Sequence, residues 1–237
     1  MPPEKPSTQP AAGRLLAIGD VHGCTMQLDA LWKAIAPTPA DTIVFLGDYV
    51  DRGPDSKGVI DRLIEWKSGF NLVCLRGNHE LMMQRSKEDR DERKIWLQVG
   101  GADTLASYSP VPGRMGKFED VPPEHEEFLD SLVDYYESES AVFVHANLDA
   151  SKPLDEQIED ELFWRPLDEP IELPSGKRVI CGHTSQKSGK ILDLKSTLCI
   201  DTYVYGGGSL TCLDVSSLHY WQANIIGKIV EADLPPR

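Results

Sequence analysis

The segment TIVFLGDYVDRG, residues 42–53, joins an apolar run rich in β-branched residues to a turn rich in charged side chains. Four other segments share this design: LLAIGDVHG (15–23), NLVCLRGNHE (71–80), AVFVHAN (141–147) and RVICGHT (178–184). Short apolar runs bounded by turn residues are typical of buried strands. We therefore predict five strands, each of which delivers polar residues at its carboxyl end.

Amphipathic helices are predicted between the first three of these strands, over approximately 26–36 and 56–68. A β-α-β-α-β order implies right-handed crossovers and a parallel core, and so an α/β fold. In open α/β sheets, ligands bind just beyond the carboxyl ends of the strands, where all five motifs fall. The polar residues of the five motifs are therefore expected to share one site.

Six side chains in these motifs are candidate metal ligands: Asp20, His22, Asp48, Asn78, His145 and His183. Carboxylates and imidazoles suit divalent Mn, Fe or Zn. Asp48 ends the second predicted strand and could bridge two ions, which is how a two-metal hydrolytic site is built. The pattern predicts a phosphoesterase with two divalent metal ions, for which Mn²⁺ is favoured and Fe, Zn or Co are alternatives.

Charged residues beside these ligands are candidate catalytic residues. Arg52 can grip phosphate oxygens through two parallel hydrogen bonds. His79 could protonate the leaving oxygen, and Asp51 is expected to orient His79 and raise its pKa. Asn78 and Arg165 are further candidate contacts to the substrate phosphate.

Each of these residues also has a simpler interpretation when it is considered alone. Asn78 could be a helix N-cap, and Asp51 with Arg52 could form a surface ion pair. A lone histidine such as His145 is more often a hydrogen-bonded core residue than a ligand. Four of the six histidines nevertheless fall inside the strand-end motifs. A shared site is therefore the preferred interpretation, whereas Arg76 is expected to be structural.

The composition limits the partners of the chain. At 237 residues with 41% hydrophobic content, it fits one domain, predicted over 14–237, after a Pro-rich tail over 1–13 that we expect to be disordered. The net charge of −14 argues against nucleic acid and against an anionic membrane surface. No heptad seam is present, so a monomer is expected.

The cysteines and the N-terminal segment bear on cellular location. Four of the five cysteines lie in apolar runs and no CxxC pair occurs, which favours buried thiols in a reducing compartment. The N-terminal segment lacks the basic and apolar regions of a signal peptide. No apolar run approaches the roughly 20 residues that span a membrane. A cytoplasmic protein is therefore expected.

Two charged segments, 80–108 and 122–138, are predicted to be helical and interrupt the series of strands. We interpret them as a helical cap beside the site, with a solvated layer over one sheet face as an equally good alternative. After residue 184, closely spaced short runs predict antiparallel strands, with Gly206–Gly208 as a loop.

The blocks GDVHG, GDYVDRG and GNHE resemble the signature of the phosphoprotein phosphatase (PPP) family of dinuclear metallophosphoesterases. With HAN and GHT, the resemblance extends over about 15–215. The segments GNHELMM, WLQVGG and GHT are most similar to the compact bacterial and phage serine/threonine protein phosphatases. The resemblance implies a four-layer α/β/β/α sandwich with two central mixed β-sheets and metals at their edge.

The resemblance also implies a role for each motif residue. Asp20, His22 and Asp48 would hold the first ion, and Asp48, Asn78, His145 and His183 the second. Arg52 would bind phosphate, and His79 with Asp51 would form the acid dyad. Asp201 lies in IDT, which matches a recurrent IDTG segment, and no role is assigned to it.

Three functions are weighed. The first is hydrolysis of phosphomonoesters on proteins, chiefly phosphoserine and phosphothreonine and secondarily phosphotyrosine, with a metal-bridging hydroxide as nucleophile. Its expected partner is a phosphorylated protein or peptide. The second is hydrolysis of bis(5'-nucleosyl) tetraphosphates; relatives with that activity tend to carry GNHD, so Glu80 favours a protein phosphatase. The third, a non-catalytic metal- or phosphate-binding scaffold, is disfavoured because no ligand or catalytic residue of the motifs is lost.

Overall fold

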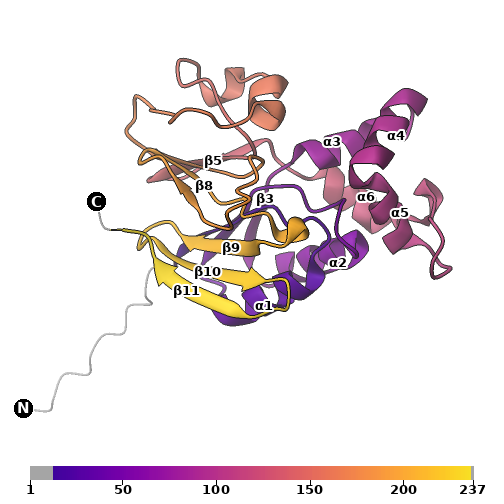
Figure 1. The fold of residues 1–237 in the computed structure, drawn as a ribbon. Coiled ribbons are helices and arrows are strands. Elements are labelled where there is room, and N and C mark those ends of the chain that lie inside the picture. The colour runs from indigo at the N-terminus through magenta and orange to yellow at the C-terminus, as the bar shows by residue number, and fades with distance from the viewer. Residues whose placement is uncertain (1–12, 236–237) are drawn as a thin grey trace, which may run out of the picture.

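Two stacked β-sheets with helices at their faces and edge make up the computed structural model, which describes residues 13–235 (Figure 1). The six-stranded sheet has the order β11-β10-β9-β1-β2-β3 and the five-stranded sheet has the order β4-β5-β6-β8-β7. The first sheet contains β1 (Leu15–Ile18), β2 (Thr42–Phe45), β3 (Asn71–Cys74), β9 (Ser209–Asp214), β10 (His219–Asn224) and β11 (Ile229–Asp233). The second contains β4 (Tyr135–Glu137), β5 (Ala141–Val144), β6 (Arg178–Cys181), β7 (Leu192–Asp193) and β8 (Thr197–Cys199).

Both sheets are mixed. Strands β1, β2 and β3 are parallel, and β9, β10 and β11 continue that sheet in antiparallel pairs. In the second sheet β5, β6 and β8 are parallel, while β4 and β7 pair antiparallel at the two edges. The predicted α/β sandwich with two central mixed sheets is confirmed. Because parallel strands end at the same edge, the motifs that follow β1, β2 and β3 meet there.

The core is divided by the alternation of side chains along each strand. In β1, Leu16 and Ile18 face the helices while Ala17 faces the second sheet. In β5, Phe143 faces the first sheet and Val142 faces outward, where Leu162 and Phe163 cover it. The outer cover consists of loops with two short helical turns, η3 (Leu154–Glu156) and η4 (Asp160–Trp164).

Helices α1 (Thr25–Ile35) and α2 (Ser56–Lys67) cover the first sheet close to where they were predicted. α1 buries Leu28, Leu31 and Ile35 on one face, as the spacing of a helix requires. α2 begins where the Asp55 side chain accepts a hydrogen bond from the Gly58 N–H at 2.9 Å.

The segment predicted to form a cap is a group of short helices beside the ends of the strands (Figure 1). It comprises α3 (Asn78–Arg85), α4 (Arg90–Trp96), a π-helical turn (Leu97–Gly101), α5 (Ala102–Tyr108), a 3₁₀ turn η2 (Phe118–Asp120) and α6 (Pro123–Asp130). The π-helical turn is kinked at Gly100, where the φ of 128° favours glycine over residues with a side chain. Helices α5 and α6 contact α2, so the cap is anchored on the helical layer.

Two expectations for secondary structure were wrong. Residues 135–137 are not helical but form β4, which pairs antiparallel with β5, because two tyrosines favour a strand where a partner lies close in sequence. The strands after residue 184 are not all antiparallel, because the 15 residues between β6 and β8 return the chain to run parallel to β6. The antiparallel arrangement of β9, β10 and β11 is confirmed.

The predicted buried thiols are also confirmed: Cys24, Cys74, Cys181, Cys199 and Cys212 are all buried and none forms a disulfide. Among residues 13–235, no helix combines the length and the apolar character that crossing a bilayer requires. Of the tail predicted over 1–13, only Gly13 lies within the described residues.

Candidate active site

The turns of the motifs hold non-glycine residues in left-handed backbone conformations. His22, Asp48, Asp51, Arg52 and His183 have φ values of 44°, 52°, 73°, 69° and 60°. Such conformations cost about 1–3 kcal/mol each and persist where surrounding contacts over-determine them. Their concentration in the candidate site indicates that these turns orient side chains toward the site in addition to connecting strands to the next elements.

Glu80 supplies the contacts that hold the central turn. Its fully buried carboxylate accepts four backbone N–H groups: Asp48 and Gly77 at 2.9 Å each, Tyr49 at 2.7 Å and Val50 at 3.2 Å. Burial, reinforced by the nearby Asp48 carboxylate, raises the pKa of Glu80 to about 7. Glu80 therefore fixes the conformation of the loop that carries Asp48.

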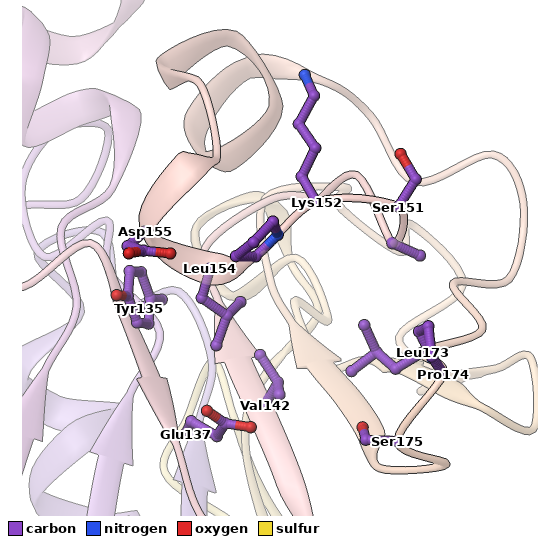
Figure 2. Close-up of a pocket in the computed structure, with 12 residues that line it drawn as sticks. Tyr135, Glu137, Val142, Ser151, Lys152, Leu154, Asp155, Leu173, Pro174 and Ser175 are labelled. Carbon is purple, nitrogen blue, oxygen red and sulfur yellow. The ribbon is translucent and has the colours of Figure 1, made fainter.

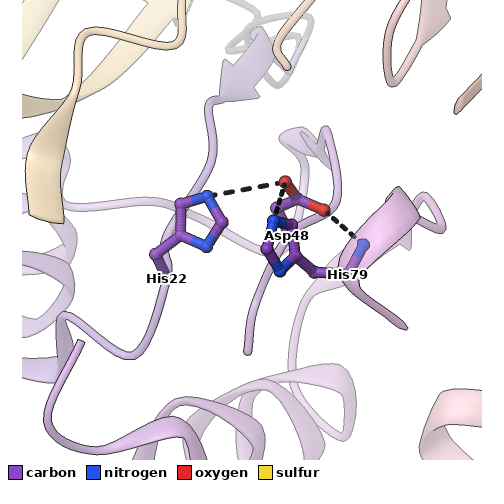
Figure 3. Close-up of side chains that lie close together, drawn as sticks. All are labelled: His22, Asp48 and His79. Carbon is purple, nitrogen blue, oxygen red and sulfur yellow. Dashed lines mark hydrogen bonds and ion pairs between the residues drawn. The ribbon is translucent and has the colours of Figure 1, made fainter. Parts of the chain in front are cut away.

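Asp48 lies between two groups of potential metal ligands. The His22 Nε2 is 3.5 Å from Asp48 Oδ2, and the His145 Nε2 is 3.5 Å from Asp48 Oδ1. Ligand atoms of His22, Asp48 and His79 lie within 4.8 Å of one another, as do those of Asp48, His145 and His183. Figure 3 shows the first group, with His22 and His79 on either side of the Asp48 carboxylate.

Three imidazoles are oriented in the same way. One ring nitrogen of each lies at a backbone carbonyl: His22 Nδ1 at Val50 O (2.9 Å), His145 Nδ1 at Leu46 O (2.8 Å) and His183 Nε2 at Trp164 O (3.2 Å). A carbonyl accepts only, so that nitrogen carries the proton and the other nitrogen offers a lone pair to the cluster. Such outer contacts fix the tautomer of metal-binding histidines.

The Asn78 amide completes the second group. Its Oδ1 lies 3.0 Å from His145 Nε2 and 3.2 Å from His183 Nδ1. The backbone carbonyls hold the protons on His145 Nδ1 and His183 Nε2. The other ring nitrogen of each histidine and the Asn78 Oδ1 are therefore three hydrogen-bond acceptors that converge without a donor between them. This convergence suits a cation, and the residues present therefore fit a divalent metal ion.

The protonation states of these side chains also fit metal binding. Burial keeps the pKa of His22 well below its usual value and lowers the pKa of His183 to about 4, so both are neutral ligands at neutral pH. Burial opposes ionisation of Asp48, but the surrounding histidines outweigh it and lower the pKa of this carboxyl group. Asp48 is therefore an anion beside the neutral imidazoles of His22 and His183.

Asp20 is buried but belongs to neither group of ligand atoms. Its two carboxylate oxygens lie 3.2 and 3.0 Å from the backbone N–H of His183. Asp20 thus joins the end of β1 to the end of β6. Its role as a ligand of the first ion stays a prediction.

His79 and Asp51 form a buried pair. The His79 Nδ1 lies 2.6 Å from Asp51 Oδ2, while Nε2 faces the cluster 4.0 Å from Asp48 Oδ2. Although burial opposes protonation, the carboxylates of Asp48 and Asp51 outweigh it and raise the pKa of His79. The imidazole is thus oriented and biased to carry a proton toward the cluster, as an acid catalyst requires.

The cap contributes two residues to this pair that the sequence reasoning missed. The Trp96 Nε1 donates to Asp51 Oδ2 at 2.8 Å, and the Thr104 Oγ1 donates to Asp51 Oδ1 at 2.6 Å. Gly100 packs so closely on the turn that an added Cβ would lie 2.6 Å from the Arg52 backbone nitrogen. The cap therefore lies beside the site, as one of the two interpretations of this segment predicted.

Arg52 extends its guanidinium to the edge of the candidate ligand cluster. Its Nη1 lies 2.9 Å from His22 Nε2, and its Cζ lies 4.6 Å from the centroid of the Tyr205 ring. The Tyr205 ring also contacts His22 edge-on at 4.8 Å between centroids. Tyr205 carried no motif signal in the sequence, yet it supports both residues.

Three further residues have clear positions. Arg165 pairs with Glu161 at 3.1 Å and is half exposed, so its contact with phosphate stays a prediction. Arg76 donates to the Leu132 carbonyl and pairs with an aspartate on the cap side, as expected of a structural residue. Asp201, to which no role was assigned, accepts hydrogen bonds from Ser185 and from the Tyr203 N–H, which fixes the loops around the site.

A cavity of about 630 Å³ lies on the outer side of the second sheet (Figure 2). Its lining includes Tyr135, Val142, Leu154 and Leu173. Val142 belongs to the strand part of AVFVHAN, but none of the lining residues is a candidate ligand or catalytic residue. It is therefore separate from the candidate active site.

With this geometry established, comparison with known proteins gives a consistent result. The family model for calcineurin-like phosphoesterases matches residues 13–193. The chain belongs to this family. The two groups of histidine and aspartate side chains that could hold metal ions are consistent with a dinuclear site in a member of this family.

Its curated relatives have different activities. Serine/threonine-protein phosphatase 1 of Salmonella typhimurium is 36% identical over 86 residues, which cover 35% of this chain and 37% of that protein. The symmetrical bis(5'-nucleosyl)-tetraphosphatase of Paracidovorax citrulli is 41% identical over 101 residues, which cover 40% of this chain and 35% of that protein. The matches span little more than one third of either relative.

Solved structures show the same fold over nearly the whole chain. A "putative diadenosine tetraphosphatase" has 23% identity and a TM-score of 0.66, with 94% of both chains covered. The cold-active protein-tyrosine phosphatase of a psychrophilic Shewanella species has 17% identity and a TM-score of 0.58, with 93% of this chain and 80% of that chain covered. At these identities the likeness concerns the fold alone.

Proposed function

We propose that this protein is a phosphoprotein phosphatase that hydrolyses phosphoserine and phosphothreonine, with phosphotyrosine as a further substrate. The observation that carries the proposal is the 2.6 Å contact between His79 and Asp51 beside the ligand cluster. A serine or threonine alkoxide is strongly basic and leaves only if it is protonated. A nucleoside diphosphate is weakly basic and needs an acid far less. The buried dyad therefore favours alkyl phosphates.

In this proposal Asp20, His22 and Asp48 would hold one divalent ion, and Asp48, Asn78, His145 and His183 would hold another. When bound, two such ions would activate water at neutral pH and offset the charge of the phosphate. The donor set of carboxylates, imidazoles and an amide suits Mn²⁺, with Fe, Zn or Co as alternatives.

The remaining steps belong to protein side chains. Arg52 would bind two phosphate oxygens and orient the phosphorus, with Asn78 and Arg165 as further proposed contacts. His79 would give the proton on Nε2 to the leaving oxygen, because its Nδ1 is held by Asp51. Asp51 in turn is held by two donors from the cap, which keeps the imidazole in one orientation.

A second candidate is hydrolysis of bis(5'-nucleosyl) tetraphosphates. The 41% identity to a protein of that name supports it. Glu80 favours the first candidate, since relatives that hydrolyse these compounds tend to carry aspartate at this position.

Comparison of kcat/KM for a phosphothreonine peptide and for diadenosine tetraphosphate, each with Mn²⁺, separates the two candidates. We expect the peptide to be the better substrate, and His79→Asn to reduce its turnover more than that of the dinucleotide. A dinucleotide rate that is higher and insensitive to His79 would support the second candidate. Metal binding without turnover of either compound would support a non-catalytic scaffold.

A further inference from the structure

A second cavity, of about 480 Å³, opens directly beside Arg52. Its lining includes Met26, Gln27, Arg52, Asp55, Tyr205 and Ile225. Arg52 and Tyr205 therefore belong both to the phosphate end of the site and to this cavity. Whatever occupies the cavity is adjacent to the phosphate that Arg52 would hold.

The rim of the cavity is apolar and exposed. Met26 is 60% exposed and Ile225 is 52% exposed. Ile225 is carried on the turn between β10 and β11, where the Asn224 side chain accepts the backbone N–H groups of residues 226 and 228 at 3.1 and 2.9 Å. The turn therefore presents an isoleucine to solvent beside an exposed methionine, so two apolar side chains are available to an occupant of the cavity.

The inner part of the cavity contains a polar group without a partner. Gln27 is only 8% exposed, and its side-chain amide forms no hydrogen bond within residues 13–235. A primary amide both donates and accepts, so it matches the N–H and C=O groups of a peptide main chain. Because Gln27 lines the cavity and its amide has no partner within the described residues, the amide is available to pair with an occupant.

We propose that this cavity, defined by Met26, Gln27, Tyr205 and Ile225, binds an apolar side chain next to the phosphorylated residue of a peptide substrate. The inference rests on the proposed protein phosphatase function and adds a sequence preference to it. Gln27 pairs with the peptide main chain, and Met26 and Ile225 contact the apolar side chain.

The charges that line the cavity favour a peptide over a dinucleotide. Among its eleven lining residues, Arg52 is the one cation and Asp55 the one carboxylate. In a dinucleoside tetraphosphate, a base reaches such a cavity only through a ribose and at least one further charged phosphate. The cavity offers no second cation to those phosphates, whereas a peptide needs none.

The test uses two phosphothreonine peptides that differ only in having leucine or serine on both sides of the phosphothreonine. We expect wild-type kcat/KM to be about tenfold higher for the leucine peptide, the size of effect typical of a small apolar pocket. The double variant Met26→Ala/Ile225→Ala should bring the ratio of the two peptides close to one. The double variant Met115→Ala/Ile158→Ala removes residues that are 57% and 50% exposed elsewhere, and should keep the wild-type ratio.

Gln27→Met tests the inner contact separately. We expect KM to rise several-fold for both peptides alike, because the main chain is common to them. An equal wild-type rate on the two peptides, or a ratio that survives the Met26→Ala/Ile225→Ala change, overturns the inference while the phosphatase proposal stands. If Met26→Ala/Ile225→Ala lowers the rate on diadenosine tetraphosphate and leaves the peptide ratio intact, the cavity binds a nucleoside, and the inference is overturned. Failure to hydrolyse either peptide overturns the phosphatase proposal and this inference with it.

Discussion

The Glu80 carboxylate accepts the backbone N–H of Asp48 at 2.9 Å, so the final residue of one motif positions the central ligand of another. Asp48 has a left-handed backbone and faces histidines from both sheets. The same carboxylate accepts three more backbone N–H groups. Those of Tyr49 and Val50 donate to Oε1, and that of Gly77 donates to Oε2. Glu80 is thus a structural anchor of the ligand cluster rather than a member of it.

Shortening this anchor should destabilise both the fold and the cluster. In Glu80→Asp the carboxylate can no longer reach all four N–H groups, and buried donors are left unpaired. We expect the free energy of unfolding to fall by about 2–4 kcal/mol and metal affinity to fall with it. Urea unfolding and calorimetric titration with Mn²⁺ measure both. The same change at exposed Glu65 should alter stability by less than about 0.5 kcal/mol, and an equal effect at the two positions would contradict this role.

Trp96 should act on catalysis through Asp51. Trp96→Phe retains most of the buried aromatic volume but removes the N–H that Asp51 accepts at 2.8 Å. We expect kcat on a phosphothreonine peptide to fall about tenfold, in line with loss of one hydrogen bond to a charged group. The less stabilised carboxylate should also raise the pKa of His79, so the basic limb of the pH–rate profile should move to higher pH.

The matching control is Trp66→Phe, which alters a tryptophan stacked on Trp32 at 3.8 Å, outside the contacts of Asp51. It should leave the pH–rate profile unchanged. A Trp96→Phe variant that loses stability but keeps both kcat and the profile would show that the indole only fills space.

Asp51→Asn should shift the pH dependence in the opposite direction. The carboxylates of Asp48 and Asp51 raise the pKa of His79 against the effect of burial, so His79 stays protonated to higher pH. Without the Asp51 charge the pKa of His79 falls, and the basic limb of kcat should move to lower pH. We expect kcat at neutral pH to decrease by at least about tenfold. A pH–rate series on the same peptide measures this, and an unmoved basic limb would exclude His79 as the acid.

How much the sequence predicts depends on how local the signal is. His22, Asp48, Asn78, His145 and His183 each follow an apolar run directly, so strand ends and ligands could be identified together. The same locality explains the prediction of α1 and α2, whose buried faces repeat with helical spacing.

Contacts between distant segments could not be predicted in this way. Trp96 and Thr104 lie 45 and 53 residues from Asp51, in a charged helical segment whose pattern indicates only a solvent-exposed face. Tyr205 meets Arg52 because β9 returns beside β1, which is a matter of strand pairing rather than of local pattern. The parallel pairing of β8 with β6 was missed for the same reason.

The central claim is that Asp48 organises a metal site while His79 supplies a proton. The most direct measurement is Mn²⁺ content together with Mn²⁺-dependent hydrolysis of p-nitrophenyl phosphate and a phosphothreonine peptide by wild type, Asp48→Asn and His79→Asn. We predict two ions per wild-type chain, loss of metal and of activity in Asp48→Asn, and retained metal in His79→Asn with a rate on the peptide lower by about 10²–10⁴-fold. Unchanged activity in both variants, or no turnover by wild type with Mn, Fe, Zn or Co, would contradict the account.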